Sequence, residues 1–416
     1  MLDMTISDIK DMVKDAKEKV ILHWNYRNLK EIPEAVRKAG RNVEEIYLKY
    51  NHLECLPYWI SDFSRVTNLY LHGNHLKSLP ATLCNMLQLT ILDLSNNELK
   101  DLPNDLGRLA NLRSLVLNNN CIESLPPSMC QLQNLKCLHL SKNRIIALPE
   151  WLGSLLQLEE IFVDYNSLIE IPNRLTLLKS LTMLSVCSNN LSYLPLNGFL
   201  SSPHIRFDSN ASLSYLSLPI FHHLVSKIQP YELEESTDAL AYGCFKYEER
   251  TKCKNNIKLL IRDNNSGTNE RIVLELPRQL ICVYSLQENK VISLWEMSLR
   301  TIYCHRYRHK LRIIQNPSKV SVEYERNFTK ATLNESEYSN SFLPYKLIMN
   351  GPTSICLNND CNLPIFTHAW IIIGIRKIDF IIPVIVVFCS HRCAAEFVKS
   401  SSFTEIYEIC SFHKIN

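Results

Sequence analysis

Glycine is scarce in this chain, at 9 of 416 residues, where soluble proteins average about 7%. No glycine-rich loop of the kind that cradles phosphate groups is present, so we do not expect a nucleotide-dependent enzyme. An excess of one charge is also missing, since 45 Lys and Arg stand against 42 Asp and Glu, for a formal net charge of +3. This balance argues against a globally basic nucleic-acid-binding protein and against an acidic disordered chain.

Targeting signals are also missing from the sequence. Residues 1–20 carry charges throughout and have no apolar core of a signal peptide. Residues 369–388 are strongly apolar, but Arg376, Lys377 and Asp379 stand at their centre, where each would cost about 2.5–3.5 kcal/mol in a membrane helix. We therefore expect two β-strands around a charged turn and no membrane span. These features predict a cytoplasmic protein whose 15 cysteines do not form disulfides.

A repeat of 23 residues organises the first half of the chain. Seven copies follow one another without a gap, from VEEIYLKYNHLECLP at 43–57 to LTMLSVCSNNLSYLP at 181–195. Asparagine occupies the same position in every copy: Asn51, Asn74, Asn97, Asn120, Asn143, Asn166 and Asn189. The pattern L-x-x-L-x-L-x-x-N-x-L is that of leucine-rich repeats. It predicts a solenoid, because no copy buries its leucines alone and each must stack on its neighbours.

The spacing within a copy predicts its local structure. The L-x-L core favours a short parallel strand with both leucines pointing inward, and the following P-x-x-L-x-x-L favours a helical or 3₁₀ return on the convex side. The asparagine is suited to bond backbone groups where the chain leaves the strand. Two irregular copies extend the array to about nine repeats. The copy at 21–33 has Arg27 in the asparagine position, and the copy at 205–216 has Asn210 two residues early. We expect a capping helix at residues 1–19 and the solenoid at 20–219.

Alternate strand residues face outward and form the concave surface, the usual binding face of a solenoid. Its aromatic and histidine side chains resemble the anchors of protein interfaces, although an ordinary solenoid face also carries some aromatics. We expect the following residues to contact a protein partner: Tyr47, Lys49, Tyr70, His72, Asp93, Asn118, His139, Phe162 and Asp164. No basic stripe runs along this face, so nucleic acid is not an expected partner.

Beyond residue 219 the repeat stops. Segments 257–263 and 271–277 around the turn-rich NNSGTN predict a β-hairpin. Segment 291–303 predicts an amphipathic helix whose apolar side contains Ile292, Trp295, Leu299 and Ile302. The basic run at 305–312 is interpreted as a solvated helix end, with a nucleic-acid or acidic partner as the alternative. Residues 220–345 are thus expected to be a small α+β region with a polar linker.

Four cysteines near the end of the chain have the spacing of a metal site. Cys356 and Cys361 form a C-x4-C pair, and Cys389 and Cys393 form a C-x3-C pair that begins 28 positions later. Two such pairs suit a tetrahedral structural zinc site, because four thiolates leave no open position for catalysis. The segment FCSHRCAAEF at 388–397 resembles the ending of treble-clef zinc fingers, so we expect a treble-clef-like zinc module at residues 346–416.

Other interpretations of the cysteines stay open. They are alternatively buried free thiols, which behave as small apolar side chains. His368 and His391 are alternative metal ligands, and Cys244 and Cys253 (C-x8-C) are a possible half-site without an evident second pair.

The order of these features is similar to that of the animal leucine-rich repeat-containing protein 28 family. The similar segments are HWNYRNLKEIP at 23–33, ISLWEMSLRTIY at 292–303, and the two cysteine pairs with NLPIFT and FCSHRC. In that family the cysteine that corresponds to Cys361 belongs to a C-x-x-C knuckle, which is wider here, and a second compact pair follows the repeats, where this chain has only Cys244 and the distant Cys253. The resemblance implies an intracellular interaction protein without an enzymatic activity.

Taken together, the sequence predicts an α/β leucine-rich repeat solenoid followed by an α+β region and a zinc module. We expect a monomeric, non-catalytic scaffold or adaptor that binds a protein partner, in intracellular signalling. No nucleophile–base pair or open metal site has a recognisable spacing. One alternative is the substrate-recognition subunit of a larger enzyme complex such as a ubiquitin ligase. A cell-surface receptor ectodomain is less favoured, because a signal peptide and cysteine-rich caps are missing.

Overall fold

The computed structural model describes residues 6–201, 203–226, 257–262, 271–277, 279–315, 352–358, 360–361, 363–377 and 381–415. The chain divides into two compact units. The first contains Met1–Leu168, Leu178–Asn189 and Pro203–Arg206, and the second contains Ile169–Leu177, Asn190–Ser202 and Phe207–Asn416. The domain boundaries at 19, 219 and 345 that the sequence favours stay predictions.

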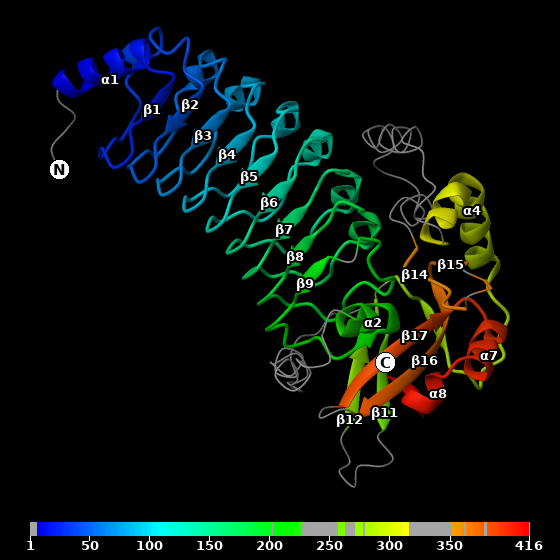
Figure 1. Cartoon of the computed structure of the whole chain (residues 1–416). Coiled ribbons are helices and arrows are strands. Elements are labelled where there is room, and N and C mark those ends of the chain that lie inside the picture. Colours follow the sequence, from blue (N-terminus) through cyan, green and yellow to red (C-terminus); the bar gives the residue numbers. More distant parts are fainter. Residues whose placement is uncertain are drawn as a thin grey trace. The chain divides into compact units, whose positions relative to one another are not determined.

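The first unit is built on one nine-stranded sheet whose strands follow in chain order (Figure 1). They are β1 (Ile21–His23), β2 (Glu45–Tyr47), β3 (Asn68–Tyr70), β4 (Ile91–Asp93), β5 (Ser114–Val116), β6 (Cys137–His139), β7 (Glu160–Phe162), β8 (Met183–Ser185) and β9 (His204–Arg206). All neighbours pair in parallel, and the middle residue of each strand is buried. This confirms the predicted solenoid with parallel strands.

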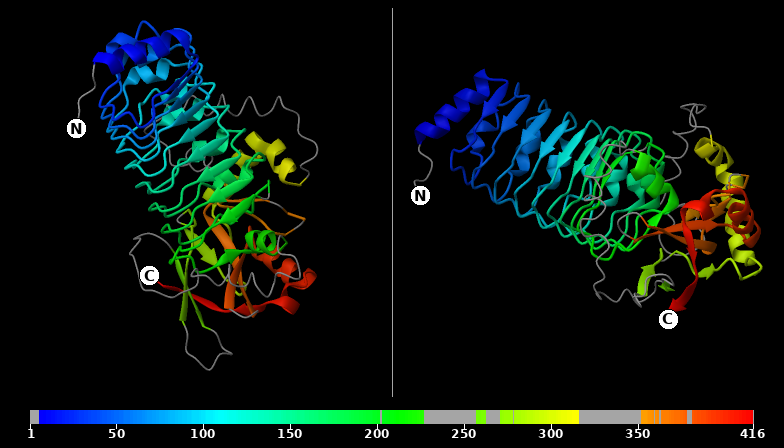
Figure 2. Two further views of the ribbon diagram at one scale, coloured as in Figure 1. Left: turned by 60° about the vertical axis from the view of Figure 1, so that its left-hand side comes forward. Right: turned by 60° about the horizontal axis from the view of Figure 1, so that its bottom comes forward.

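Short 3₁₀ helices return the chain after each of the strands β1 to β6 (Figure 2). In this unit they are η1 (Glu34–Val36), η2 (Tyr58–Asp62), η3 (Ala81–Asn85), η4 (Leu106–Arg108), η5 (Pro127–Gln131) and η6 (Glu150–Ser154). Proline precedes η1, η2, η3, η5 and η6 at the N-cap position, because its fixed φ already suits the start of a helical turn. The predicted convex return is therefore confirmed.

The repeated asparagines connect successive repeats. Asn120 shows the pattern: its Nδ2 donates to the carbonyls of Leu117 and Leu94, each at 3.0 Å, and its Oδ1 accepts from the amide of Leu99 at 3.0 Å. Asn210 bonds in a similar way to Leu191 and Phe207 despite its early position. The side chain thus satisfies buried backbone groups at each turn, which a stack of strands would otherwise leave unpaired.

A helix precedes the first strand. Helix α1 (Ile6–Glu18) buries Met12 and Ala16, while Ile9 and Val13 are half-buried. The helix predicted for residues 1–19 is confirmed within the described residues; Met4 lies outside them.

The second unit has mixed α and β structure. Its elements are η7 (Asn173–Leu177), β10 (Leu216–Ser217), α2 (Leu218–Ser226), β11 (Lys258–Arg262), β12 (Arg271–Glu275), β13 (Cys282–Tyr284), α4 (Leu294–Gln315), β14 (Ser354–Ile355), β15 (Pro364–Ile365), β16 (His368–Lys377), β17 (Ile381–Phe388), α7 (His391–Ser400), α8 (Phe403–Ile406), β18 (Glu408–Cys410) and β19 (Phe412–Ile415). One sheet has the order β10-β17-β16-β13, with β18 also on β16, and another has the order β12-β11-β19. Strands β14 and β15 form a small hairpin of their own.

Both predicted hairpins of this unit are confirmed. Strands β11 and β12 pair in antiparallel fashion. Strands β16 and β17 do the same over the apolar stretch that the sequence assigned to β structure rather than to a membrane. Within the described part of the chain, no helix is long and apolar enough to cross a membrane.

The helix at 291–303 is present as α4, but the prediction of its buried side was wrong. Leu299 is buried as expected, whereas Trp295 and Ile302 are 39% and 48% exposed. The buried side contains Glu296, Arg300 and Tyr303. Burial of Glu296 and Arg300 is tolerated because they form an ion pair and bond backbone groups, as described below. The spacing of apolar residues does not show such pairs, so by itself it selects the wrong side of the helix.

Candidate metal centre and concave surface

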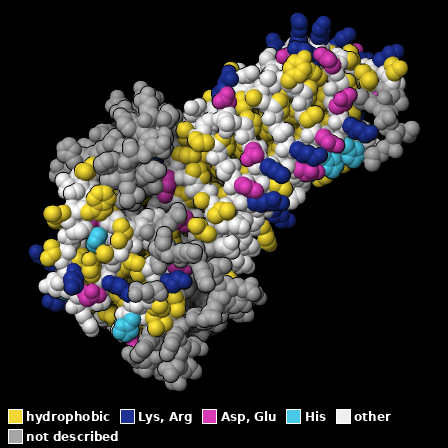
Figure 3. Space-filling view, turned by 180° about the vertical axis from the view of Figure 1, so that it is seen from behind, with side chains coloured by type: hydrophobic (Ala, Val, Ile, Leu, Met, Phe, Trp, Pro, Cys, Tyr) yellow, Lys and Arg dark blue, Asp and Glu magenta, His cyan; other side chains and the backbone are white. Residues whose placement is uncertain are grey.

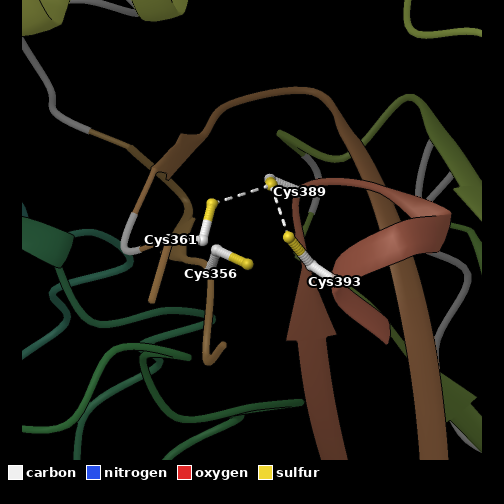
Figure 4. Close-up of side chains that lie close together, drawn as sticks. All are labelled: Cys356, Cys361, Cys389 and Cys393. Carbon is white, nitrogen blue, oxygen red and sulfur yellow. Dashed lines mark hydrogen bonds between the residues drawn. The ribbon is translucent and has the colours of Figure 1, made fainter. Parts of the chain in front are cut away.

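The four predicted ligands lie together in the second unit. The sulfur atoms of Cys356, Cys361, Cys389 and Cys393, here called the tetracysteine cluster, all lie within 4.8 Å of one another. Sγ of Cys389 is 3.4 Å from Sγ of Cys361 and 3.6 Å from Sγ of Cys393 (Figure 4). Three of the four residues are buried and Cys361 is half-buried. Such a group can hold a metal ion.

Two separate turns deliver the two cysteine pairs. Cys356 follows β14, and its amide bonds the carbonyl of Leu363 at 2.9 Å, while the amide of Cys361 bonds the carbonyl of Asn358 at 3.0 Å. On the other side, Cys389 follows β17 directly. The hydroxyl of Ser390 accepts from the amide of Cys393 at 3.2 Å and so caps α7, as serine commonly does at a helix start.

The thiols influence one another electrostatically. Hydrogen bonds with Cys356 and with Cys389 lower the pKa of Cys361 to about 2. Hydrogen bonds to Cys361 and to Cys389, together with burial, raise the pKa of Cys356. The contacts between the sulfur atoms thus shift the pKa values of Cys356 and Cys361 in opposite directions. A cation at the centre would favour the thiolate form of all four, because thiolate is the form that binds metal.

The alternative ligands lie elsewhere. Nδ1 of His368 is 2.9 Å from the hydroxyl oxygen of Thr367, and Nε2 of His391 is 2.9 Å from the carbonyl oxygen of Leu286. Neither belongs to the cluster. Cys244 and Cys253 lie outside the described residues, as do the side chains of the basic run 305–312.

Two residues near the cluster were missed at the sequence level. Glu296 is fully buried and Arg300 is 6% exposed, and Arg300 Nε donates to Glu296 Oε1 at 2.8 Å. Arg300 also donates to the carbonyl of Cys389 at 3.1 Å. The sequence feature that could have indicated this pair was the i, i+4 spacing of opposite charges on a predicted helix. Because such pairs usually lie on the exposed surface of a helix, the spacing alone does not predict a buried pair.

The aromatic end of the concave surface lies in the first repeats. The rings of Tyr47 and Tyr70 stack with centroids 4.5 Å apart, and Lys49 Nζ lies 4.5 Å from the Tyr70 ring centroid. The hydroxyl of Tyr47 donates to Glu45 at 2.8 Å, and this bond, with burial, raises the pKa of Tyr47 to about 12. Tyr47 therefore stays a neutral hydrogen-bonding group at physiological pH.

A polar edge adjoins these rings. His72 contacts the Ser95 hydroxyl at 2.6 Å and the Tyr50 hydroxyl at 2.8 Å, and Tyr50 stacks on Tyr26 with centroids 4.9 Å apart. Tyr26 and Tyr50 were not predicted as binding residues. They occupy the position before the expected asparagine, which has positive φ in each repeat. That conformation usually selects glycine or asparagine. Tyrosine at this position is therefore an unusual choice, and it was the sequence feature that could have added Tyr26 and Tyr50 to the predicted contact residues.

Three predicted contact residues also bond within the array. Asn118 Oδ1 accepts from the amide of Ser141 at 2.8 Å, and Asp164 Oδ1 accepts from the amide of Cys187 at 2.7 Å. Asp93 Oδ1 accepts from the amide of Ser95 at 3.1 Å. Asn118 and Asp164 thus form a second connection between repeats, parallel to the asparagine ladder. Their side chains contribute to stacking whatever else they contact.

His139 and Phe162 form an edge-to-face pair with ring centroids 4.8 Å apart. Nε2 of His139 is 3.8 Å from a carboxylate oxygen of Glu160, so the polar edge of the histidine lies beside an acidic group.

The face seen in Figure 3 carries Lys and Arg side chains mixed with Asp and Glu. This mixture matches the balanced net charge of the chain.

Comparisons with known proteins agree with the repeat geometry. Residues 63–194 match the family described as a leucine-rich repeat region. The first unit is therefore a leucine-rich repeat solenoid, a fold that generally serves as a non-catalytic scaffold for protein interactions. A search of curated proteins found no match. Membership of the leucine-rich repeat-containing protein 28 family stays a prediction.

Three solved structures are similar to part of the chain. Internalin C2 of Listeria monocytogenes is 23% identical over 43% of this chain and 76% of its own, with a TM-score of 0.39. The ectodomain of the plant membrane receptor kinase GASSHO1/SCHENGEN3 of Arabidopsis thaliana is 26% identical over 45% of this chain and 25% of its own, with a TM-score of 0.40. A leucine-rich repeat protein of Leptospira interrogans is 21% identical over 52% and 82%, with a TM-score of 0.30.

Proposed function

We propose that this protein is a cytoplasmic, monomeric and non-catalytic scaffold or adaptor in intracellular signalling, and that it binds a protein partner on its concave surface. The observation that carries the proposal is the set of aromatic side chains on outward strand positions, with the Tyr47–Tyr70 stack in two neighbouring repeats and the His139–Phe162 pair in two others. Rigid aromatic side chains provide large contact areas at low entropic cost, which is why they dominate protein interfaces.

The experiment combines partner identification with a concave-face variant. Proximity labelling in cells would identify proteins near the intact chain, and co-purification would then compare it with the double variant His139→Asp, Phe162→Asp. We expect the variant to lose its partners and to stay folded. The edge-to-face pair that it removes is worth about 0.5–1.5 kcal/mol beyond the apolar area that the two rings bury. The matched control is Ile146→Asp, a 58% exposed position outside the strands. An unchanged partner set in the double variant would place the binding surface elsewhere.

We also propose that the tetracysteine cluster holds one structural zinc ion. Tetrahedral zinc with bonds of about 2.3 Å to sulfur places neighbouring sulfur atoms about 3.8 Å apart, and the separations of 3.4 and 3.6 Å around Cys389 approach this value. Cys356, Cys361, Cys389 and Cys393 would supply all four ligands. Zinc would cross-link the turn that carries Cys356 and Cys361 to the turn that carries Cys389 and Cys393.

Elemental analysis of the purified chain should find about one zinc per molecule. Free alkylation of all four thiols in the native protein would refute the site.

A further inference from the structure

A buried ion pair on α4 bonds the chain segments that lead to both cysteine pairs of the tetracysteine cluster. Glu296 is completely buried, and its carboxylate accepts from the amides of Phe366 at 2.9 Å and Thr367 at 2.8 Å, from the Thr367 hydroxyl at 2.8 Å, and from Arg300 at 2.8 Å. These four bonds fill the accepting capacity of the carboxylate. A buried charge with this many partners is held in a single geometry.

Glu296 fixes the segment that carries the first cysteine pair. Phe366 and Thr367 are the two residues between β15 and β16. Strand β15 pairs with β14, the strand that ends directly before Cys356, and α4 packs beside β15 (Figure 1). The hydroxyl of Thr353 closes the same hairpin by donating to the carbonyl of Phe366 at 2.6 Å. A shift of Glu296 would therefore move the hairpin that places Cys356 and Cys361.

Arg300 fixes the second pair. Its Nη1 donates to the carbonyl of Cys389 at 3.1 Å and its Nη2 donates to the carbonyl of His368 at 3.2 Å. Cys389 is the first residue after β17 and His368 is the first residue of β16. One guanidinium thus joins the start of β16 to the residue after β17, and one of its bonds is to the backbone of a predicted ligand residue.

We propose that Glu296 and Arg300 are positioning residues of the tetracysteine centre, and that they couple the docking of α4 to metal binding. The inference rests on the proposed metal centre and adds to it the chain segment that holds the ligands in place. Its physical basis is that Glu296 bonds the backbone at the end of the hairpin that carries the first cysteine pair, whereas Arg300 bonds the backbone of Cys389 in the second pair. The distance between the two pairs therefore depends on α4. Partners beyond the direct ligands commonly change metal affinity by about 10- to 100-fold.

The test measures zinc affinity of the full chain by competition with a chromophoric chelator. We expect Arg300→Met to weaken zinc binding by about 10- to 100-fold, and Arg300→Lys to recover part of the loss because one ammonium reaches fewer acceptors. The matched control is Arg392→Met, which removes another i, i+4 ion pair next to a cysteine, but one whose arginine side chain is 87% exposed. This control should bind zinc as the unsubstituted chain does.

A thermal measurement separates positioning from a general effect on folding. Zinc should raise the melting temperature of the unsubstituted chain above that of the chelator-treated chain. We expect this increment to shrink in Arg300→Met and to stay constant in Arg392→Met. If Arg300→Met does not fold, Thr367→Val, which removes one bond to Glu296, should weaken zinc binding in the same direction. The inference would be overturned if folded Arg300→Met bound zinc as tightly as the control Arg392→Met does. It would also be overturned if Thr367→Val, used where Arg300→Met does not fold, matched that control. Absence of zinc from the unsubstituted chain would instead overturn the metal centre, and the inference with it.

Discussion

The guanidinium of Arg300 and the backbone carbonyl of Cys389 form a 3.1 Å hydrogen bond between residues 89 positions apart in the chain. Arg300 belongs to a helix that the sequence assigned to a separate α+β region, and Cys389 belongs to the predicted zinc module. The bond places a buried charge, compensated by Glu296, directly on the backbone of a predicted ligand. The cysteine module is thus built with elements from a larger part of the chain than its cysteine spacing indicates.

Loss of one cysteine should abolish the stabilisation by zinc. Cys393→Ser leaves three thiolates, so the melting temperature of this variant should no longer respond to a chelator. For the unsubstituted chain the difference should correspond to about 4 kcal/mol when free zinc exceeds its Kd a thousandfold. Cys55→Ser, at an exposed cysteine of the solenoid, is the control and should keep the full response. Calorimetry with and without chelator measures both, and a chelator response in Cys393→Ser would contradict the four-thiolate site.

The asparagine ladder should be a major source of solenoid stability. Asn120→Ala removes the bonds to Leu94, Leu117 and Leu99. The carbonyls of Leu94 and Leu117 keep their bonds from Asn97 and Asn143, so the buried amide of Leu99 is the group that loses its partner. We expect the free energy of unfolding to fall by about 1–3 kcal/mol, the cost of one buried backbone group left without a partner. Asn111→Ala removes a single exposed bond to Leu87 and should cost less than about 1 kcal/mol. Urea unfolding compares the two, and equal losses would show that the ladder contributes little.

A tyrosine in the second unit should make the protein sensitive to alkali. The hydroxyl of Tyr215 is buried with no hydrogen-bond partner among the described residues, and burial raises its pKa well above 10. Because the folded-state pKa is raised, stability is complete below pH 10 and is lost as the pH rises, when the unfolded chain releases the proton first. Tyr215→Phe should stabilise the chain by about 1 kcal/mol at pH 7 and reduce the alkaline loss. Unfolding curves at pH 7 and above pH 10 test this, and an unchanged alkaline loss would contradict it.

Gly73 should resist substitution because of its backbone and its neighbour. Its φ is +71°, and a Cβ there would lie 2.7 Å from the Tyr50 ring. We expect Gly73→Ala to cost about 1–2 kcal/mol from the left-handed conformation, plus the displacement of Tyr50. The Tyr50→Ala background removes the second contribution, so a double-mutant cycle of unfolding free energies should show coupling between the two sites. Strict additivity would mean that the ring moves without cost.

Much of the first unit was predictable because its determinants are local and repeated. The leucines, the ladder asparagines and the prolines before the 3₁₀ helices each recur at a fixed spacing, and the structure uses them as the spacing indicates. The buried side of α4 was not predictable in this way. Trp295 is half-exposed while Glu296 is buried, because hydrogen bonds to Phe366 and Thr367, 70 positions away, decide which side of the helix faces inward.

The sequence by itself determined the solenoid and the identity of the four clustered cysteines, because both depend on the kind and spacing of residues within short segments. The tertiary structure alone decided how the cysteines are held. Glu296 bonds the backbone amides of Phe366 and Thr367, and Arg300 bonds the backbone carbonyls of His368 and Cys389. Every residue has such backbone groups, so no sequence pattern reveals which of them will be bonded. A buried charge is stable only where such partners surround it, and that condition is met only once the distant strands have paired.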